Sequence, residues 1–101
     1  MKQRVLEYLS TIPAGKVATY GSVAAAVGHP GAARAVGNIL HRNPDPHRFP
    51  CHRVVSASGR LAPNFAFGGP EGQRKKLEDE GVEVTGGKVD LKRYGWQLHL
   101  S

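Results

Sequence analysis

The stretch TYGSVAAAVGHPGAARAVGNILHR, residues 19–42, combines two segments of helical composition with a short break between them. Thr19 is a good helix cap, and Gly28 readily takes the left-handed conformation that ends a helix, so a helix is predicted over 20–27. After the break HPG, a second helix is predicted over 32–42, because the Asn-Pro pair that follows cannot continue it. Two short helices joined by a tight turn that contains glycine are typical of a helix-turn-helix motif.

Outside this motif the chain predicts further helices and a small amount of β structure. The helix predicted over 2–11 stops before a proline, and the proline-rich stretch 43–50 is expected to be a rigid loop. Residues 53–61 predict a short strand, a turn and a return. A further helix is expected over 70–80, with Pro70 near its start and Gly81 as its terminator, followed by a hairpin around Gly86 and Gly87. The expected fold class is mainly α with a small β element, a winged helix-turn-helix-like single domain over 1–101.

Length and charge narrow the classes of function. A chain of 101 residues supports one core, and fourteen Lys and Arg against eight Asp and Glu give a net charge of +6. Such a charge is typical of a protein that meets a polyanion, although a merely soluble basic protein has it too. No apolar run approaches the ~20 residues of a membrane span, and the N-terminus does not have the pattern of a signal peptide, so we expect a cytoplasmic protein with no membrane partner.

Cysteine and histidine counts argue against structural cross-links. A single cysteine cannot form an internal disulfide, and the five histidines lack metal-ligand spacing, so no metal is expected. These histidines are His29, His41, His47, His52 and His99.

The helix predicted over 32–42 has a surface of small residues. Ala33 and Gly37 allow close approach to a sugar-phosphate backbone, and Arg34 is the one long side chain near the start of the helix. Such a helix would read little sequence but suits the minor groove, with Arg34 inserted into the base stack as in proteins that bend DNA or extrude a base. The alternative is that the alanines pack against another helix and Arg34 forms a surface ion pair.

The segment FPCHRVV, residues 49–55, contains the only cysteine. Cys51 is either a nucleophile or a small buried hydrophobe, because free cysteine is often inert. His52 is the obvious base, but neighbours in a regular strand point to opposite faces, so the two cooperate only through an irregular backbone or a water. Glu80 is a candidate orienting acid because the helix dipole disfavours a carboxylate at that end, although it could equally be a solvated member of the EDE run.

Taken in order, IPAGKVATYG, AARAVGNIL, NP, PCHRVV and EGV resemble the O6-alkylguanine-DNA alkyltransferases, also called methylated-DNA-protein-cysteine methyltransferases, over roughly residues 10–84. The resemblance implies that Cys51 accepts the alkyl group of a flipped guanine in duplex DNA, irreversibly and without a cofactor. It further implies that His52 acts as base through a water, with Glu80 orienting it and Asn43 supporting the network.

The same resemblance implies a DNA-binding face and a lesion pocket. Arg34 would fill the gap that the flipped base leaves, while Tyr20 presses on the adjacent phosphate. The pocket wall would be formed by the loop from about Asn64, with Phe65 or Phe67 stacking on the base. The full implied DNA-binding set is Thr19, Tyr20, Ala33, Arg34, Gly37 and Asn38, and the implied pocket set is Phe65, Phe67, Gly68 and Gly69.

Two other functions remain open. The short chain and the C-terminal DLKRYGWQ also resemble the alkyltransferase-like proteins, which bind alkylated guanine without removing the alkyl group and pass the lesion to nucleotide excision repair. An ordinary helix-turn-helix regulator is the third hypothesis. It is disfavoured by the alanine-rich helix and by the lack of an obvious dimerisation element, and the latter leads us to expect a monomer.

Overall fold

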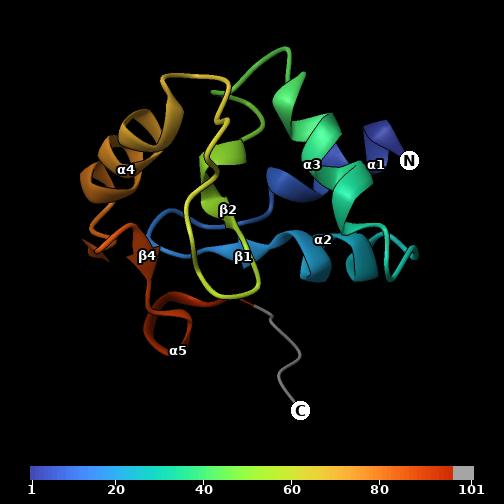
Figure 1. Cartoon of the computed structure of the whole chain (residues 1–101). Coiled ribbons are helices and arrows are strands. Elements are labelled where there is room, and N and C mark those ends of the chain that lie inside the picture. The colour runs from blue at the N-terminus through green and yellow to red at the C-terminus, as the bar shows by residue number, and fades with distance from the viewer. Residues whose placement is uncertain (97–101) are drawn as a thin grey trace.

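The computed structural model describes residues 1–96, which form five α-helices, a 3-10 helix and four two-residue strands (Figure 1). The fold is therefore mainly α with a small β element, as predicted. Gln97 of the DLKRYGWQ motif and His99 lie outside the described residues. No helix within residues 1–96 is long and apolar enough to cross a membrane. The elements in chain order are α1 (Lys2–Leu9), β1 (Ala18–Thr19), α2 (Tyr20–Ala26), α3 (Ala33–His41), the 3-10 helix η1 (Cys51–Arg53), β2 (Val54–Val55), α4 (Gly69–Asp79), β3 (Val84–Thr85), β4 (Lys88–Val89) and α5 (Leu91–Tyr94).

The predicted helix-turn-helix is formed by α2 and α3. The Thr19 side chain accepts a hydrogen bond from the Ser22 amide (3.1 Å), and the Ser22 hydroxyl accepts one from the Thr19 amide (3.0 Å), so the two residues make a reciprocal capping box. Gly28 has φ +85° just after α2 ends, as expected of a residue that terminates a helix. Val36 and Leu40 turn the buried face of α3 toward α1 and α2.

The β structure differs from the prediction for residues 53–61. A strand does form at Val54–Val55, but it pairs in parallel with Ala18–Thr19, which the sequence analysis left without a strand. The return leg pairs elsewhere, because Arg60 forms a bridge with Lys88. A two-residue strand is too short to show a periodic pattern, so its partner is set by the tertiary fold and not by its own sequence.

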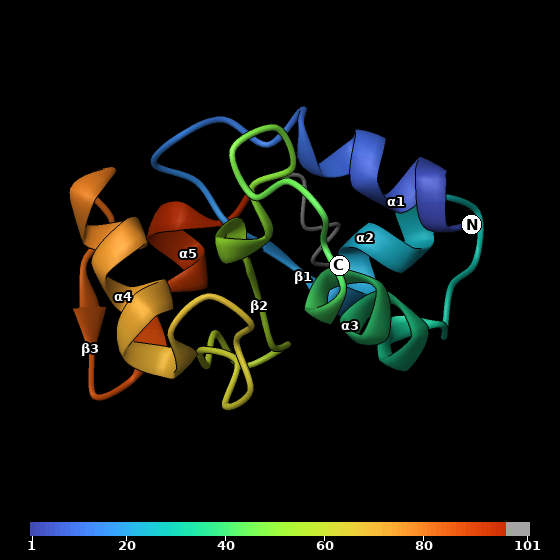
Figure 2. The same ribbon diagram turned by 90° about the horizontal axis from the view of Figure 1, so that it is seen from above.

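The pair β1–β2 separates two hydrophobic clusters. Successive residues of a strand point to opposite faces. Accordingly Ala18 and Val54 pack into the cluster beneath α1, α2 and α3, whereas Val17 and Val55 pack into the cluster with Leu77 of α4. Figure 2 shows β1 and β2 between the helices α1, α2 and α3 on one side and α4, α5 and β3 on the other. Since η1 directly precedes β2, the cysteine lies at the junction of the two clusters.

The C-terminal elements follow the sequence prediction closely. Pro70 occupies the second position of α4, and at the other end Gly81 (φ +85°) lets the Val82 amide bond to the Leu77 carbonyl (3.0 Å) in a Schellman-type ending. Strands β3 and β4 form the expected hairpin around two glycines with positive φ. The short helix α5 was not predicted.

Two helical glycines should respond in opposite ways to the same substitution. A Cβ at Gly37 in α3 would meet only the Tyr20 ring, at 4.0 Å, so Gly37→Ala should stabilise the protein by about 1 kcal/mol through helix propensity. A Cβ at Gly72 in α4 would lie 2.4 Å from the Phe67 carbonyl oxygen, so Gly72→Ala should destabilise it by about 2 kcal/mol. Urea unfolding of both variants measures the change in unfolding free energy. Changes of the same sign would contradict the packing described for α4.

Candidate functional site

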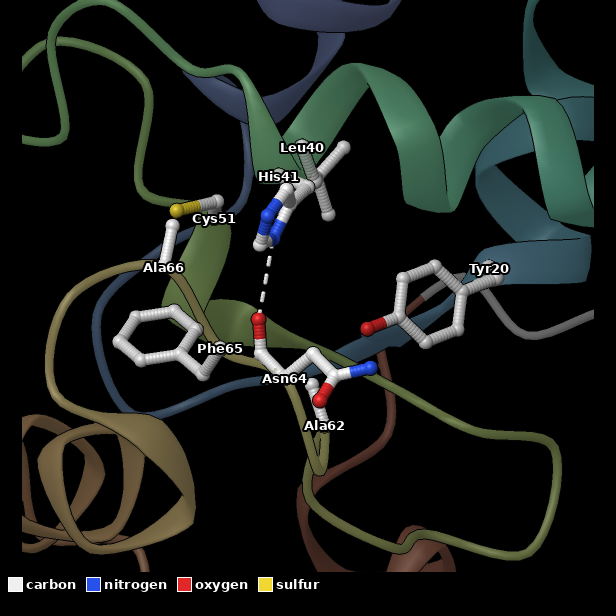
Figure 3. Close-up of a pocket in the computed structure, with 8 residues that line it drawn as sticks. All are labelled: Tyr20, Leu40, His41, Cys51, Ala62, Asn64, Phe65 and Ala66. Carbon is white, nitrogen blue, oxygen red and sulfur yellow. Dashed lines mark hydrogen bonds between the residues drawn. The ribbon is translucent and has the colours of Figure 1, made fainter.

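The cysteine lines a small pocket between the helix-turn-helix and the loop before α4. Cys51 begins η1, and its side chain is 3% exposed. The space open to water molecules in this pocket is about 30 Å³, against roughly 300 Å³ for the smallest typical sites of small molecules. The pocket is therefore too small for a nucleobase in this conformation. Its lining residues are Tyr20, Leu40, His41, Cys51, Ala62, Asn64, Phe65 and Ala66 (Figure 3).

A hydrogen bond joins the two walls of this pocket. His41, the last residue of α3, contacts the carbonyl oxygen of Asn64 through Nδ1 at 3.0 Å. A carbonyl only accepts, so Nδ1 carries the proton. In Figure 3 the bond runs across the pocket, with Cys51 on one side and the Tyr20 ring on the other. The loop 62–66 is thus tied to the end of α3, a contact that the sequence analysis did not predict.

The pocket keeps the thiol of Cys51 protonated. Burial raises the pKa of Cys51 above its ordinary value of 9.0, and the Asn43 side chain and the Lys76 ammonium offset this rise only in part. Burial likewise raises the pKa of Tyr20, and the Coulombic interaction with Cys51 adds to it. At neutral pH both groups are uncharged, so Cys51 attacks only after a base removes its proton.

His52 of η1 contacts Glu80, the residue that caps the end of α4. The Nε2 atom of His52 lies 3.1 Å from a carboxylate oxygen of Glu80, but the ring N–H is not aligned well enough for a regular hydrogen bond. Burial lowers the pKa of His52 below 6.5, although the Glu80 carboxylate works in the opposite direction. His52 is therefore neutral at physiological pH and able to accept a proton.

Arg53 fixes the carboxylate that His52 contacts. Its Nε donates to the two carboxylate oxygens of Glu80 at 2.9 and 3.2 Å, and its Nη1 donates to the Ile12 carbonyl at 2.7 Å. Burial by itself would raise the pKa of Glu80, but Arg53 and His52 outweigh it and leave that pKa below its ordinary value. Glu80 is the C-cap of α4, where the helix dipole disfavours a negative charge, and Arg53 supplies the compensating positive charge. The sequence indicated that Glu80 needed a partner but did not identify Arg53.

Asn43 organises the loop that leads to the cysteine. Its amide donates to the Phe49 carbonyl at 2.7 Å, and its side-chain oxygen accepts from the Asp45 amide at 3.0 Å. The buried Asn43 therefore holds the proline-rich segment at both ends and fixes the approach to η1. Its side chain also lowers the pKa of the thiol, which places it in the same network as Cys51.

Two of the implied DNA-binding residues, Arg34 and Asn38, lie on one exposed face of α3. Arg34, Asn38 and His41 follow the i, i+4, i+7 spacing of one helix face, and all three are exposed. None of the ion pairs in residues 1–96 includes Arg34, so the surface ion pair that was the alternative for this residue is not formed. Ala33 and Gly37 are half-buried on the same helix, and Thr19 is engaged in capping α2.

The four implied pocket residues are only partly brought together. Phe65 lines the pocket, whereas Phe67 packs edge-on against Phe65 with ring centroids 5.8 Å apart. Gly69 lines an open groove that adjoins the pocket and shares His41 and Phe65 with it, and Gly68 has φ +108° as the N-cap of α4. These glycines therefore shape the entry to α4 instead of facing the thiol.

The described residues 1–96 contain no group of three or more His, Cys, Asp or Glu side chains that could hold a metal ion. The side chains of the site itself are a buried thiol, a neutral imidazole and a carboxylate held by Arg53.

Comparison with known proteins gives consistent matches over most of the chain. The family model of the 6-O-methylguanine DNA methyltransferase DNA-binding domain matches residues 1–82. The DNA base-flipping protein of Escherichia coli (strain K12) is 45% identical over 97 residues, covering 93% of this chain and 72% of that protein. A methylated-DNA–protein-cysteine methyltransferase of Mycobacterium leprae (strain TN) is 50% identical over 76 residues, which cover 75% of this chain and 43% of that protein. The crystal structure of S. pombe Atl1 in complex with damaged DNA containing O6-carboxymethylguanine superposes with a TM-score of 0.83 at 35% identity, covering 94% of this chain and 93% of that one.

Breaking the pair of Arg53 and Glu80 should be costly. Arg53→Met leaves a largely buried carboxylate without its main partner, so we expect a loss of about 3 kcal/mol in unfolding free energy. Arg93→Met is the matched control. Arg93 contacts Glu83 at 3.5 Å with both side chains about two-thirds exposed, and its loss should cost no more than about 1 kcal/mol. Chemical denaturation of both variants gives the comparison, and equal costs would show that Arg53 is not needed to hold Glu80.

Proposed function

Because the chain belongs to the 6-O-methylguanine DNA methyltransferase family, we propose that it extrudes O6-alkylguanine from duplex DNA through the minor groove and transfers the alkyl group to Cys51. One observation carries the proposal: Cys51 lines a pocket shared with Tyr20 and Phe65, and the next residue of η1, His52, contacts the Glu80 carboxylate at 3.1 Å. A protein that only binds DNA has no use for a thiol with an oriented base beside it.

The transfer is a single displacement. His52 removes the thiol proton of Cys51 through a water, and the sulfur attacks the alkyl carbon. The new C–S bond forms as the bond from that carbon to O6 breaks, and the guanine leaves as an anion. It takes up the proton that His52 removed from the thiol, returned through water, so no net proton is gained or lost. The Glu80 carboxylate, held by Arg53, stabilises the imidazolium that forms on His52. The cysteine ends as a thioether, so each protein molecule reacts once.

The exposed face of α3 supports a base-flipping step. Arg34 is free to enter the base stack, and the small surface at Gly37 permits close approach to the DNA backbone. A pocket of about 30 Å³ does not hold a guanine, so loop 62–66 moves away from α3 when a base enters. The Phe65 ring then offers a surface on which the base stacks.

A second candidate function is recognition of the lesion without transfer. The superposition on Atl1 over nearly the whole length of both chains favours it, as does the similarity to proteins named for base flipping. In that case Cys51 is a packing residue, and the bound lesion is passed to nucleotide excision repair proteins. Both candidates include extrusion of the base and differ only in what happens to the alkyl group.

Intact-mass measurement separates the two candidates. After mixing with a duplex that carries one O6-methylguanine, the protein should gain the mass of one methyl group, and a Cys51→Ser variant should gain none. An unchanged mass for the wild type, together with lesion-specific binding in the same sample, would rule out transfer and favour recognition alone.

Removing the Arg34 side chain should selectively weaken recognition of the lesion. Arg34→Ala is expected to reduce affinity for the lesion duplex by about tenfold more than affinity for an unmodified duplex, because a wedge acts only when a base is extruded. The control Arg74→Ala removes the same charge from α4, on the other side of the molecule (Figure 2). It should change the affinities for the lesion duplex and the unmodified duplex by the same factor. Fluorescence anisotropy measures both affinities. Equal losses in the Arg34→Ala variant would assign Arg34 to phosphate contacts alone.

A further inference from the structure

A fully buried glutamine connects the turn that carries Cys51 to the loop that lines the pocket. Gln73 of α4 is 0% exposed, although polar side chains of its length usually reach solvent. Its Oε1 accepts a hydrogen bond from the Ala62 amide at 2.7 Å. Its Nε2 donates to the carbonyl oxygens of His52 at 3.1 Å and Val54 at 2.9 Å.

Each of these bonds reaches a segment that matters for the pocket. The His52 carbonyl belongs to η1, which positions the thiol, and the Val54 carbonyl belongs to β2, the strand that follows. Ala62 is the first residue of the loop that lines the pocket opposite α3. One side chain therefore fixes the distance between the turn that carries Cys51 and the start of the loop.

The amide group suits this position because it satisfies three backbone groups at once. A glutamine amide has two N–H donors and one carbonyl acceptor. Here the amide nitrogen donates two hydrogen bonds and the oxygen accepts one. An apolar side chain of the same size would leave those backbone groups without this partner, at a high cost in a buried site. Packing alone would be served by the leucine found one turn later in α4, Leu77, which is equally buried.

We propose that Gln73 is a positioning residue for the lesion pocket. By anchoring Ala62 to η1 and β2, it keeps one end of the loop fixed while the exposed residues that follow move to admit a base. The inference rests on the proposed function and deepens it, because it assigns the discrimination between lesion and normal guanine in part to a residue that contacts neither.

The principal test compares the Gln73→Met variant with its parent in a Cys51→Ser background, where transfer cannot occur. The readout is the ratio of affinities for an O6-methylguanine duplex and an unmodified duplex of the same sequence. Gln73→Met should lower this ratio about tenfold while affinity for the unmodified duplex stays within about twofold. The control Leu77→Ala, which destabilises α4 without touching the three bonds, should keep the parent ratio. A parent without lesion preference refutes the proposed function, whereas a parent with preference and an unchanged Gln73→Met ratio refutes only the role of Gln73.

The Gln73→Glu variant adds a pH profile that a purely structural role would not produce. Burial raises the pKa of a carboxyl group placed there. When protonated, it can again accept from Ala62 and donate to one of the two carbonyls, so the lesion preference should recover as the pH falls and be lost as the pH rises. His52, Glu80, Arg53 and Lys76 are the charged or titratable groups nearby, so the ratio is taken relative to the parent at each pH. A ratio that stays flat with pH contradicts the hydrogen-bonding role.

If the Gln73 variants do not fold, hydrogen exchange in the protein that retains Gln73 tests its positioning role. The Ala62 amide should be protected in the free protein and should exchange more slowly still with the lesion duplex, but not with the unmodified one. Equal exchange with both duplexes would overturn the proposal.

Discussion

The parallel contact between β1 and β2 is the constraint on which the remaining structure depends. Each strand has only two residues, yet their pairing places the capped start of α2 beside the segment that follows Cys51. The same two strands present one face to each hydrophobic cluster, so neither cluster is complete without them. Tyr20 directly follows β1 and Arg53 directly precedes β2, and this short ladder therefore sets the distance between the helix-turn-helix and the reactive turn.

Charge at the site is arranged so that little has to change during a reaction. The thiol and the imidazole are neutral, and the carboxylate of the partly buried Glu80 is fixed by Arg53 before any base enters. A carboxylate that is already fixed next to a neutral histidine lowers the cost of forming an imidazolium.

Local signals in the sequence predicted more of the fold than of the site. Helix caps, prolines and glycines act within a few residues, so the helix-turn-helix, the ends of α4 and the final hairpin follow from the sequence alone. The parallel pairing and the role of Arg53 depend on segments that are distant in the chain, and no local pattern reports them. Gln73 was missed for a different reason: within QRKKLEDE it looks like another solvated polar residue, and only the packing of α4 buries it. Glu80 is the instructive exception, because a carboxylate at the wrong end of a helix signals a missing partner even when that partner cannot be named.

Burial of the thiol also determines how readily Cys51 reacts with small oxidants and electrophiles. A thiol that is 3% exposed and has a raised pKa carries little thiolate, and thiolate is the form that peroxides and soluble electrophiles attack. While the loop remains bonded to His41, oxidants in solution therefore have little access to the sulfur and encounter little thiolate. Under the proposed transfer, in which each cysteine reacts once, burial keeps the thiol reduced between encounters with DNA.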